Sequence, residues 1–355
     1  MKAMLEQSDE KRVPSGYAGQ NDKKFVWPEH VPRGGRSFSP DEHGRWAQLW
    51  ATVGAAAWAG LAVLARAGFA RIGGIELMFL FAPLVVVPLG MELGSRLGAS
   101  GGLAEVARRM QPLGAGLTVA SMMLPVGRVA GLVAAGWLAV CVLTAGDGVA
   151  TLISSSWQDT GRSARATRAA LAIARVDLAV GGAWLVASRL GMRPMGIQEP
   201  IGLLTAVHFH YAGFATATIA AATLSWAEQD APQRWLRLVV MAVLGLPFLV
   251  AAGFVISPVL KMIAGVLFSA SVALLAFALL LGLKRFTHST ARLLLRVASG
   301  AVLAGMVFSG VYAIADFAGS DALPIPQMAR THGILNGVGF CLPGLLGWLI
   351  EGSAE

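Results

Sequence analysis

Apolar residues fill the chain in long runs that are separated by short polar stretches. A helix that spans a membrane needs about 20 consecutive, mostly apolar residues, and most of the runs reach that length. The pattern therefore predicts an all-α fold, a polytopic bundle of about ten transmembrane helices. Their approximate ranges are 46–65, 73–95, 111–126, 129–150, 169–188, 200–224, 236–256, 259–282, 293–317 and 332–350.

The third segment, 111–126, departs from this pattern because it is short and contains Pro125. A proline inside a helix removes a backbone hydrogen bond and interrupts the helix. This segment is therefore expected to span, to form a re-entrant piece, or to be half of a hairpin.

The positions of the basic residues predict the orientation. Most of the 28 Lys and Arg residues fall in the N-terminal stretch and in alternate loops, such as those around Arg108, Arg165, Arg237 and Arg285. Cytoplasmic loops of membrane proteins carry an excess of Lys and Arg. An even number of helices with both termini in the cytoplasm fits this alternation, whereas one helix more or fewer would scramble it.

Composition divides the chain into two parts. Residues 1–44 are polar, contain four prolines and have few aliphatic side chains, so they are expected to form a flexible cytoplasmic tail without a cleavable signal peptide. Residues 45–351 are expected to form a single transmembrane domain, since no soluble domain fits between two segments. Only 14% of the chain is charged, against about 25% in soluble domains, so lipid must solvate much of its surface.

Three features exclude other classes of protein. The net charge of +8 comes from topogenic basic residues, which argues against nucleic-acid binding. Cys141 and Cys341 lie in apolar runs without metal-ligand spacing, and they are expected to be buried thiols rather than a disulfide. The chain has no nucleophile elbow, phosphate-binding loop, dinucleotide fingerprint or haem-attachment motif in a suitable context.

The sixth segment carries the strongest candidate chemistry, since it opens with E-P-I-G-L-L-T-A-V-H-F-H-Y. Ionisable side chains inside a membrane are costly and mark functional sites by default. Pro200 suits a first helical position, which would place Glu199 at the N-cap, where a cap alone is the plainer interpretation. His208 and His210 differ by about 200° on an ideal helix, so we expect one to face a polar cavity and the other to bond a neighbouring helix. Thr205 and Tyr211 share the His208 face.

Two further segments bring polar groups to the same outer half. His332 and Asn336 share a face of the tenth segment, below Arg330 at its mouth, and Tyr312 and Asp316 lie one turn apart at the end of the ninth. Successive segments cross the membrane in alternating directions, which places these groups at the same outer depth as those of the sixth segment. This predicts a polar cavity that opens on the non-cytoplasmic side. The plainer alternative is that they serve as interfacial residues, helix ends and packing hydrogen bonds. Arg175 and Asp177 lie inside the fifth segment at an angle that disfavours direct pairing, and Asp177, the deeper of the two, is a secondary candidate with an expected structural ion pair or hydrogen bond.

The two runs E-P-I-G-L-L-T-A-V-H-F-H-Y-A-G-F and R-T-H-G-I-L-N-G-V-G-F resemble the YndJ-like family of bacterial polytopic membrane proteins. The resemblance covers roughly residues 45–350 and is most specific at 199–214 and 331–340. It implies a bacterial inner-membrane protein in which Glu199, His208, His210, His332 and Asn336 matter. It implies no reaction.

Three functions compete. The first is acid–base catalysis, a cyclisation or isomerisation of a lipid or isoprenoid-like substrate, in which Glu199 or Asp316 donates a proton, a histidine accepts one and Asn336 orients the substrate. The second is a proton-coupled transporter or permease for a small solute or lipid, with a path that continues towards Glu92 or Asp147. The third is a sensor or assembly subunit with structural polar residues. The expected partners are the bilayer and a lipophilic small molecule. No cofactor is expected, and a metal ion stays an alternative, although a His-x-His metal site is awkward on a helix.

Overall fold

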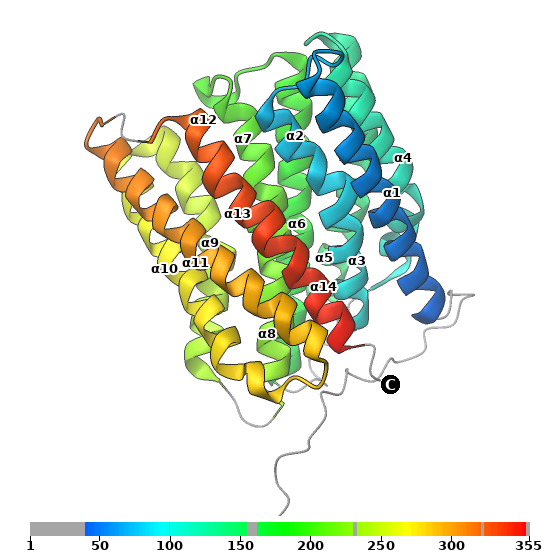
Figure 1. Cartoon of the computed structure of the whole chain (residues 1–355), viewed down its shortest axis with the longest axis vertical. Coiled ribbons are helices and arrows are strands. Elements are labelled where there is room, and N and C mark those ends of the chain that lie inside the picture. The colour runs from blue at the N-terminus through cyan, green and yellow to red at the C-terminus, as the bar shows by residue number, and fades with distance from the viewer. Residues whose placement is uncertain (1–39, 99, 155–161, 230–232, 321–322, 353–355) are drawn as a thin grey trace, which may run out of the picture.

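The structure, a computed structural model, describes residues 40–352 apart from residues 99, 155–161, 230–232 and 321–322. All regular structure within these residues is helical, which confirms the all-α expectation. The long helices lie side by side along the long axis of the molecule (Figure 1).

Each of the ten predicted segments coincides with one helix or with a run of consecutive helices. Three of the ten are runs, in which short π-helical stretches interrupt the α-helix. In chain order the elements are α1 (Pro40–Arg66); α2 (Gly74–Phe81), η1 (Ala82–Val86) and α3 (Val87–Arg96); α4 (Gly102–Met123); α5 (Arg128–Ile153); α6 (Arg162–Leu190); η3 (Pro194–Gly196); α7 (Ile201–His208), η4 (Phe209–Thr216) and α8 (Ala217–Ala227); α9 (Arg234–Ile256); α10 (Pro258–Gly282); η5 (Leu283–Arg285); α11 (Ser289–Phe317); α12 (Ile325–Met328), η6 (Ala329–Gly333), α13 (Ile334–Asn336), η7 (Gly337–Cys341) and α14 (Leu342–Glu351).

Eight helical segments of the described chain are long and apolar enough to cross a membrane. The two that fall outside this set are α4 and the run α7–η4–α8. Arg108, Arg109 and Gln111 lower the apolar character of α4, and His208 and His210 do the same for the other run. The multi-pass helical architecture is thus established, whereas ten crossings stay a prediction.

The third predicted segment is longer and starts earlier than its apolar stretch suggested. Helix α4 begins at Gly102 and ends at Met123, before Pro125, so this proline terminates the helix rather than interrupting it. The helix instead accommodates Pro112 in its interior. The boundary at residue 111 was wrong because the polar first turns of α4 masked its beginning.

The centre of the bundle is formed by the segment from α2 to α3 and by α6 and α8. In the apolar window of Gly74–Arg96, 72% of residues are buried inside the protein, against 17% in that of Gly44–Arg66. The peripheral helices expose large apolar side chains, among them Val63, Leu132, Leu238 and Leu281. A continuous apolar exterior of this kind requires lipid as its solvent.

The three interrupted runs meet one another in the interior. The π-helical segment η4 contacts both η1 and η7, and η6 lies against α2. A π-helical turn widens the helix, and such turns occur often at functional sites. The predicted facing of side chains assumed ideal helices, so these segments are where that prediction is least secure.

Helix α1 begins and α14 ends at the same end of the bundle, which we call the terminal end; α7 and α12 begin at the opposite end (Figure 1). This arrangement agrees with an even number of passes, whereas the side of the membrane stays a prediction. At the terminal end, Glu351 accepts hydrogen bonds from the backbone N–H groups of Thr287 (2.7 Å) and His288 (3.1 Å), at the start of α11. Residues 1–39 of the predicted tail lie outside the described residues, and its last residues belong to α1.

Candidate functional site

His210 is fully buried in η4 and binds two neighbours through its ring. The Trp137 Nε1–H donates to its Nε2 at 2.9 Å, and its Nδ1 lies 2.8 Å from the carbonyl oxygen of Ala206. An indole N–H can only donate, so Nε2 carries no proton and Nδ1–H donates to Ala206. His210 therefore fastens η4 to α5, which is the helix-bonding role that the spacing predicted for one of the two histidines.

Tyr211 is also buried, and it joins the interrupted runs. Its hydroxyl donates to the carbonyl oxygen of Met78 in α2 at 2.7 Å. Its ring packs against Gly337 in η7, where an added Cβ would lie 3.1 Å from Cε1 of the tyrosine. A larger residue at 337 would push these two helices apart.

His208 is exposed on α7, unlike His210. Its Nδ1 lies 2.7 Å from the carbonyl oxygen of Leu204, so Nδ1 carries the proton and Nε2 is left without a partner among the described residues. Thr205 bonds only to the carbonyl oxygen of Ile201 in its own helix. The two imidazoles thus diverge, as their spacing predicted.

Glu199 is exposed and acts as a helix cap. Its Oε2 accepts a hydrogen bond from the backbone N–H of Leu203 at 3.2 Å. The helix begins at Ile201, so Pro200 takes the N-cap position and Glu199 precedes it by one residue, contrary to the predicted register. The plainer interpretation, a capping carboxylate, describes this contact.

His332 and Asn336 pack together against a glycine of α11. The Nδ1 of His332 lies 2.9 Å from the carbonyl oxygen of Gly305, and Nδ2 of Asn336 donates to the carbonyl oxygen of His332 at 2.6 Å. An added Cβ at Gly305 would lie 2.6 Å from Nδ2 of Asn336. Since the Gly305 carbonyl can only accept, His332 donates from Nδ1, and its Nε2 has no partner in the described part of the chain.

Asp316 lies apart from this pair, at the end of α11. Its Oδ2 forms an ion pair with Nζ of Lys261 in α10 at 2.6 Å. Gly305, which holds His332, precedes Asp316 by three turns, or about 16 Å along a straight helix. The expected common depth of Asp316 and His332 was therefore wrong. The last segment begins at Ile325, so His332 is already about two turns inside it.

The remaining secondary candidates lie near these groups. Tyr312 is half-buried one turn before Asp316, and Arg330 is exposed in η6. Glu199 and Asp316 each have their own partner, away from the imidazoles, so the structure does not bring the predicted acids and bases to one point.

A cavity with about 390 Å³ of empty space, part of it open to the outside, lies towards the terminal end of the bundle. Its walls come from α3, α4, α5, α6, η4 and α8, and none of the predicted site residues lines it. We expected a cavity at the other end, because the histidines and carboxylates were assumed to face an open space. In the structure most of them are engaged by neighbouring helices.

Arg175 forms one wall of this cavity, and a buried ion pair holds it in place. Its Nη1 lies 2.6 Å from Oδ2 of Asp147 in α5. The other oxygen of Asp147 accepts from the backbone N–H groups of Gly101 (2.8 Å) and Ala104 (3.3 Å), which belong to the start of α4. One carboxylate thus joins three helices and satisfies N–H groups that a helix start leaves free. The pairing with Asp147 agrees with the angle that separates Arg175 from Asp177.

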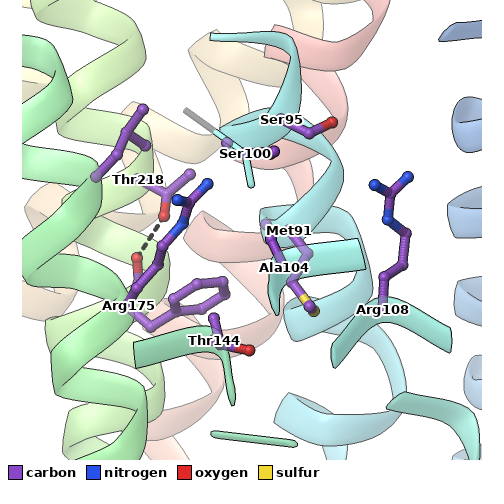
Figure 2. A pocket seen from close by; sticks show the side chains of 12 residues that line it. Met91, Ser95, Ser100, Ala104, Arg108, Thr144, Arg175 and Thr218 are labelled. Atoms are coloured by element: carbon purple, nitrogen blue, oxygen red, sulfur yellow. Dashed lines mark hydrogen bonds between the residues drawn. The ribbon is translucent and has the colours of Figure 1, made fainter. Parts of the chain in front are cut away.

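Arg108 stands on the opposite wall, with Met91 and Ala104 between the two arginines (Figure 2). Its Nη2 pairs with Oε2 of Glu105 at 2.7 Å, while its Nη1 is buried without a hydrogen-bond partner. The hydroxyls of Ser95, Thr144 and Thr218 donate to backbone carbonyls of their own helices, and that of Ser100 has no partner among the described residues.

Asp177 is fully buried on the other face of α6, and neither of its carboxylate oxygens has a hydrogen-bond partner within the described chain. It packs on Gly213 of η4, where an added Cβ would lie 2.7 Å from Cβ of the aspartate. The expected structural ion pair or hydrogen bond was wrong. A buried polar group left unsatisfied calls for a specific explanation.

The model of the family described as YndJ-like protein matches residues 77–340. The chain belongs to the YndJ-like family. The matched region includes the cavity and all of the predicted site residues.

The uncharacterized membrane protein YndJ of Bacillus subtilis (strain 168) is 32% identical over 179 residues. The match covers 50% of this chain and 32% of that relative, so the chain spans about a third of the relative's length. No solved structure matches the chain. The YndJ-like relative and the apolar helices together support a multi-pass membrane protein.

Sequence reasoning overlooked the contact between Arg175 and Asp147. Both charges were visible inside apolar segments, on consecutive helices and with opposite signs, which is the signal that could have paired them. Arg108 was assigned to topology alone. The hydrogen bond between Trp137 and His210 could not be predicted from the sequence, because a tryptophan in an apolar helix does not reveal which residue of another helix its indole contacts.

Proposed function

We propose that this YndJ-like protein is a proton-coupled permease for a small solute or lipid, with Asp177 as the proton-binding group. The observation that supports this most is the fully buried Asp177 carboxyl without a hydrogen-bond partner. An ionised carboxylate without a partner is costly in an apolar interior, so gain or loss of its proton must accompany a change in its surroundings.

The position of Asp177 supports coupling to the cavity. Asp177 lies near the middle of the 29-residue helix α6, the depth at which transporters hold coupling ions. It packs on the π-helical segment η4, and interrupted helices are a usual part of such sites. The same two elements supply Arg175 and Phe214 to the cavity, so a movement of η4 against α6 would alter both places.

The cavity also reaches the groups towards which a transport path was expected to continue. Arg175 on its wall is paired with Asp147. Glu92, the residue directly after the lining residue Met91, is buried with its Oε2 unsatisfied. Charged groups in membrane segments commonly mark such paths.

Asp177→Asn tests the proposal, because it keeps the shape of the side chain and removes the proton site. The control is Glu76→Gln, which changes a partly exposed carboxylate in the first turn of α2. In infrared difference spectra across a pH titration of the purified protein, we expect a protonated-carboxyl band that is lost in Asp177→Asn and kept in Glu76→Gln. In proteoliposomes loaded with pyranine, a pulse of at least one of succinate, phosphate and glycine is expected to move protons in the wild type and in Glu76→Gln, but not in Asp177→Asn. Absence of the titrating band together with absence of flux for every solute would overturn the permease.

A second candidate is acid–base catalysis on a lipid or isoprenoid-like substrate in the bacterial inner membrane. It is favoured by one observation, which is that His208 and His332 both hold Nδ1 on a backbone carbonyl and leave Nε2 free. Asn336 would orient a substrate, and Glu199 or Asp316 would act only after rearrangement.

Lipid extraction and mass spectrometry separate this candidate from the permease. Cells that express the wild type, Glu199→Gln or His332→Ala are compared. A lipid that accumulates only in the variants would support catalysis, and identical profiles in all three would exclude it.

A further inference from the structure

We propose that the cavity beside Arg175 binds a phosphate group, carried either by inorganic phosphate or by the headgroup of an anionic phospholipid. This names the ligand chemistry of the proposed permease, and it rests on that function for the movement of the ligand, though not for its binding.

Arg175 supplies the principal donor. Its Nη1 is held by Asp147, and its Nη2 has no partner among the described residues. A guanidinium offers several N–H groups in a fixed planar fork that suits phosphate oxygens. The contact with Asp147 fixes the orientation of the guanidinium, so the remaining N–H donors of Arg175 are already positioned before a ligand binds.

Ser100 and Arg108 complete the lining with further unused donors. The Ser100 hydroxyl has no partner in the described chain, and it lies towards the head of Arg175 in Figure 2. Arg108 contributes positive charge from the far wall, and its buried Nη1 lacks an acceptor. A buried cation with an unsatisfied donor gains when an anionic acceptor enters.

The charge balance favours an exchangeable ligand. Asp147 neutralises Arg175, and Glu105 is shared between Arg108 and Arg109, so the cavity offers hydrogen-bond donors with only a modest excess of positive charge. The empty space of about 390 Å³ includes open solvent, so a phosphate group would enter from the open side and a lipid glycerol moiety would stay outside the protein.

The cavity also lies towards one end of the bundle, which is the level expected for phospholipid phosphates when the helices span a bilayer. Its lining residues Ser95 and Ser100 flank the turn between the end of α3 and the start of α4, at one end of the bundle. Basic pockets between membrane helices at this level are known to hold anionic headgroups.

Isothermal titration with inorganic phosphate tests the first source on purified full-length protein in detergent. Arg175→Lys keeps the charge and the pairing with Asp147 but loses the fork, so we expect affinity to fall at least about 10-fold. Ser100→Ala and Arg108→Gln are expected to weaken binding too, and either one serves if Arg175→Lys fails to fold. Arg109→Gln is the matched control, because Arg109 pairs with the same Glu105 from an exposed position, and affinity should stay within about 2-fold.

Nanodiscs that contain phosphatidylglycerol and phosphatidylcholine test the second source, with retained lipid measured by native mass spectrometry. Selective retention of phosphatidylglycerol by the wild type and by Arg109→Gln, lost in the other variants, would identify a headgroup. Folded wild type that binds neither ligand, or binding that all variants preserve, would overturn the inference. Phosphate binding without proton flux would overturn the permease alone, and flux of other solutes without phosphate binding would overturn this inference alone.

Discussion

His210 shows how hydrogen bonds to its neighbours give a membrane histidine a structural role and leave no ring nitrogen free for proton transfer. Its Nε2 accepts from Trp137, its Nδ1 donates to Ala206, and its ring stacks on the indole with centroids 5.9 Å apart. Every polar atom of this imidazole is used, whereas His208 and His332 each keep a free nitrogen. The three histidines look alike in sequence, and only their neighbours separate them.

Trp137→Phe tests the structural role of His210. The change keeps an aromatic ring but leaves Nε2 buried without a donor, which should lower the free energy of unfolding by about 1–3 kcal/mol. Thermal unfolding in detergent, followed by intrinsic fluorescence, measures the loss. Trp235→Phe, at an exposed position on α9, should change it by less than about 0.5 kcal/mol. Equal unfolding temperatures for the two variants would mean that the hydrogen bond contributes nothing.

At the scale of elements, Asp147 makes the start of α4 depend on α5 and α6. The N-cap residue of α4 is Gly101, which has no side chain to cap the helix, and the carboxylate of Asp147 takes over that role from another helix. The same carboxylate neutralises Arg175. One carboxylate therefore both caps the start of α4 and supplies the counter-charge of Arg175.

Asp147→Ala is expected to destabilise the protein by about 3–5 kcal/mol, because it leaves the buried Arg175 without a counter-charge. Asp147→Asn keeps an acceptor for Gly101 and should cost less. The double variant Asp147→Leu/Arg175→Met removes both charges and should recover part of the loss. Thermal unfolding of the three proteins measures this order, and a double variant less stable than Asp147→Ala would contradict it.

Much of the element level could be predicted from the sequence. All ten apolar segments became helices or runs of helices, since the length of an apolar run is a property of the chain itself. The start of α4 and the start of α12 were missed, because both helices begin with polar or proline-containing turns. The π-helical segments had no signal in the apolar pattern, and they altered the facing of the side chains after Phe209 and Ala329.

At the scale of the whole molecule, the candidate site was harder to predict than the fold. The polar residues of segments six, nine and ten stand out in the sequence, but their expected convergence required that they lie at equal depths. Asp316 forms an ion pair with Lys261, whereas His332 bonds to the carbonyl oxygen of Gly305, which lies three helical turns before Asp316 in α11. Which partner a side chain meets depends on helix packing, and a single sequence does not contain that information.

The orientation of the molecule gives a prediction at the same scale. Lys284 is exposed at the terminal end and Gln198 is exposed at the opposite end. With both termini in the cytoplasm, a membrane-impermeant maleimide should label Gln198→Cys in intact spheroplasts and Lys284→Cys only after permeabilisation. The native thiols of Cys141 and Cys341 are buried, so background labelling should be low. The reverse pattern would invert the topology.

The hydrogen bonds that Glu351 accepts from Thr287 and His288 also set an order of assembly. Helix α11 is synthesised well before α14, and the start of α11 cannot gain these acceptors until α14 has entered the membrane. Until then the nascent bundle is an intermediate in which these two N–H groups lack the carboxylate that accepts from them in the folded protein. Closing the bundle is therefore a late event, and a ribosome that pauses within α14 would expose that intermediate for as long as the pause lasts.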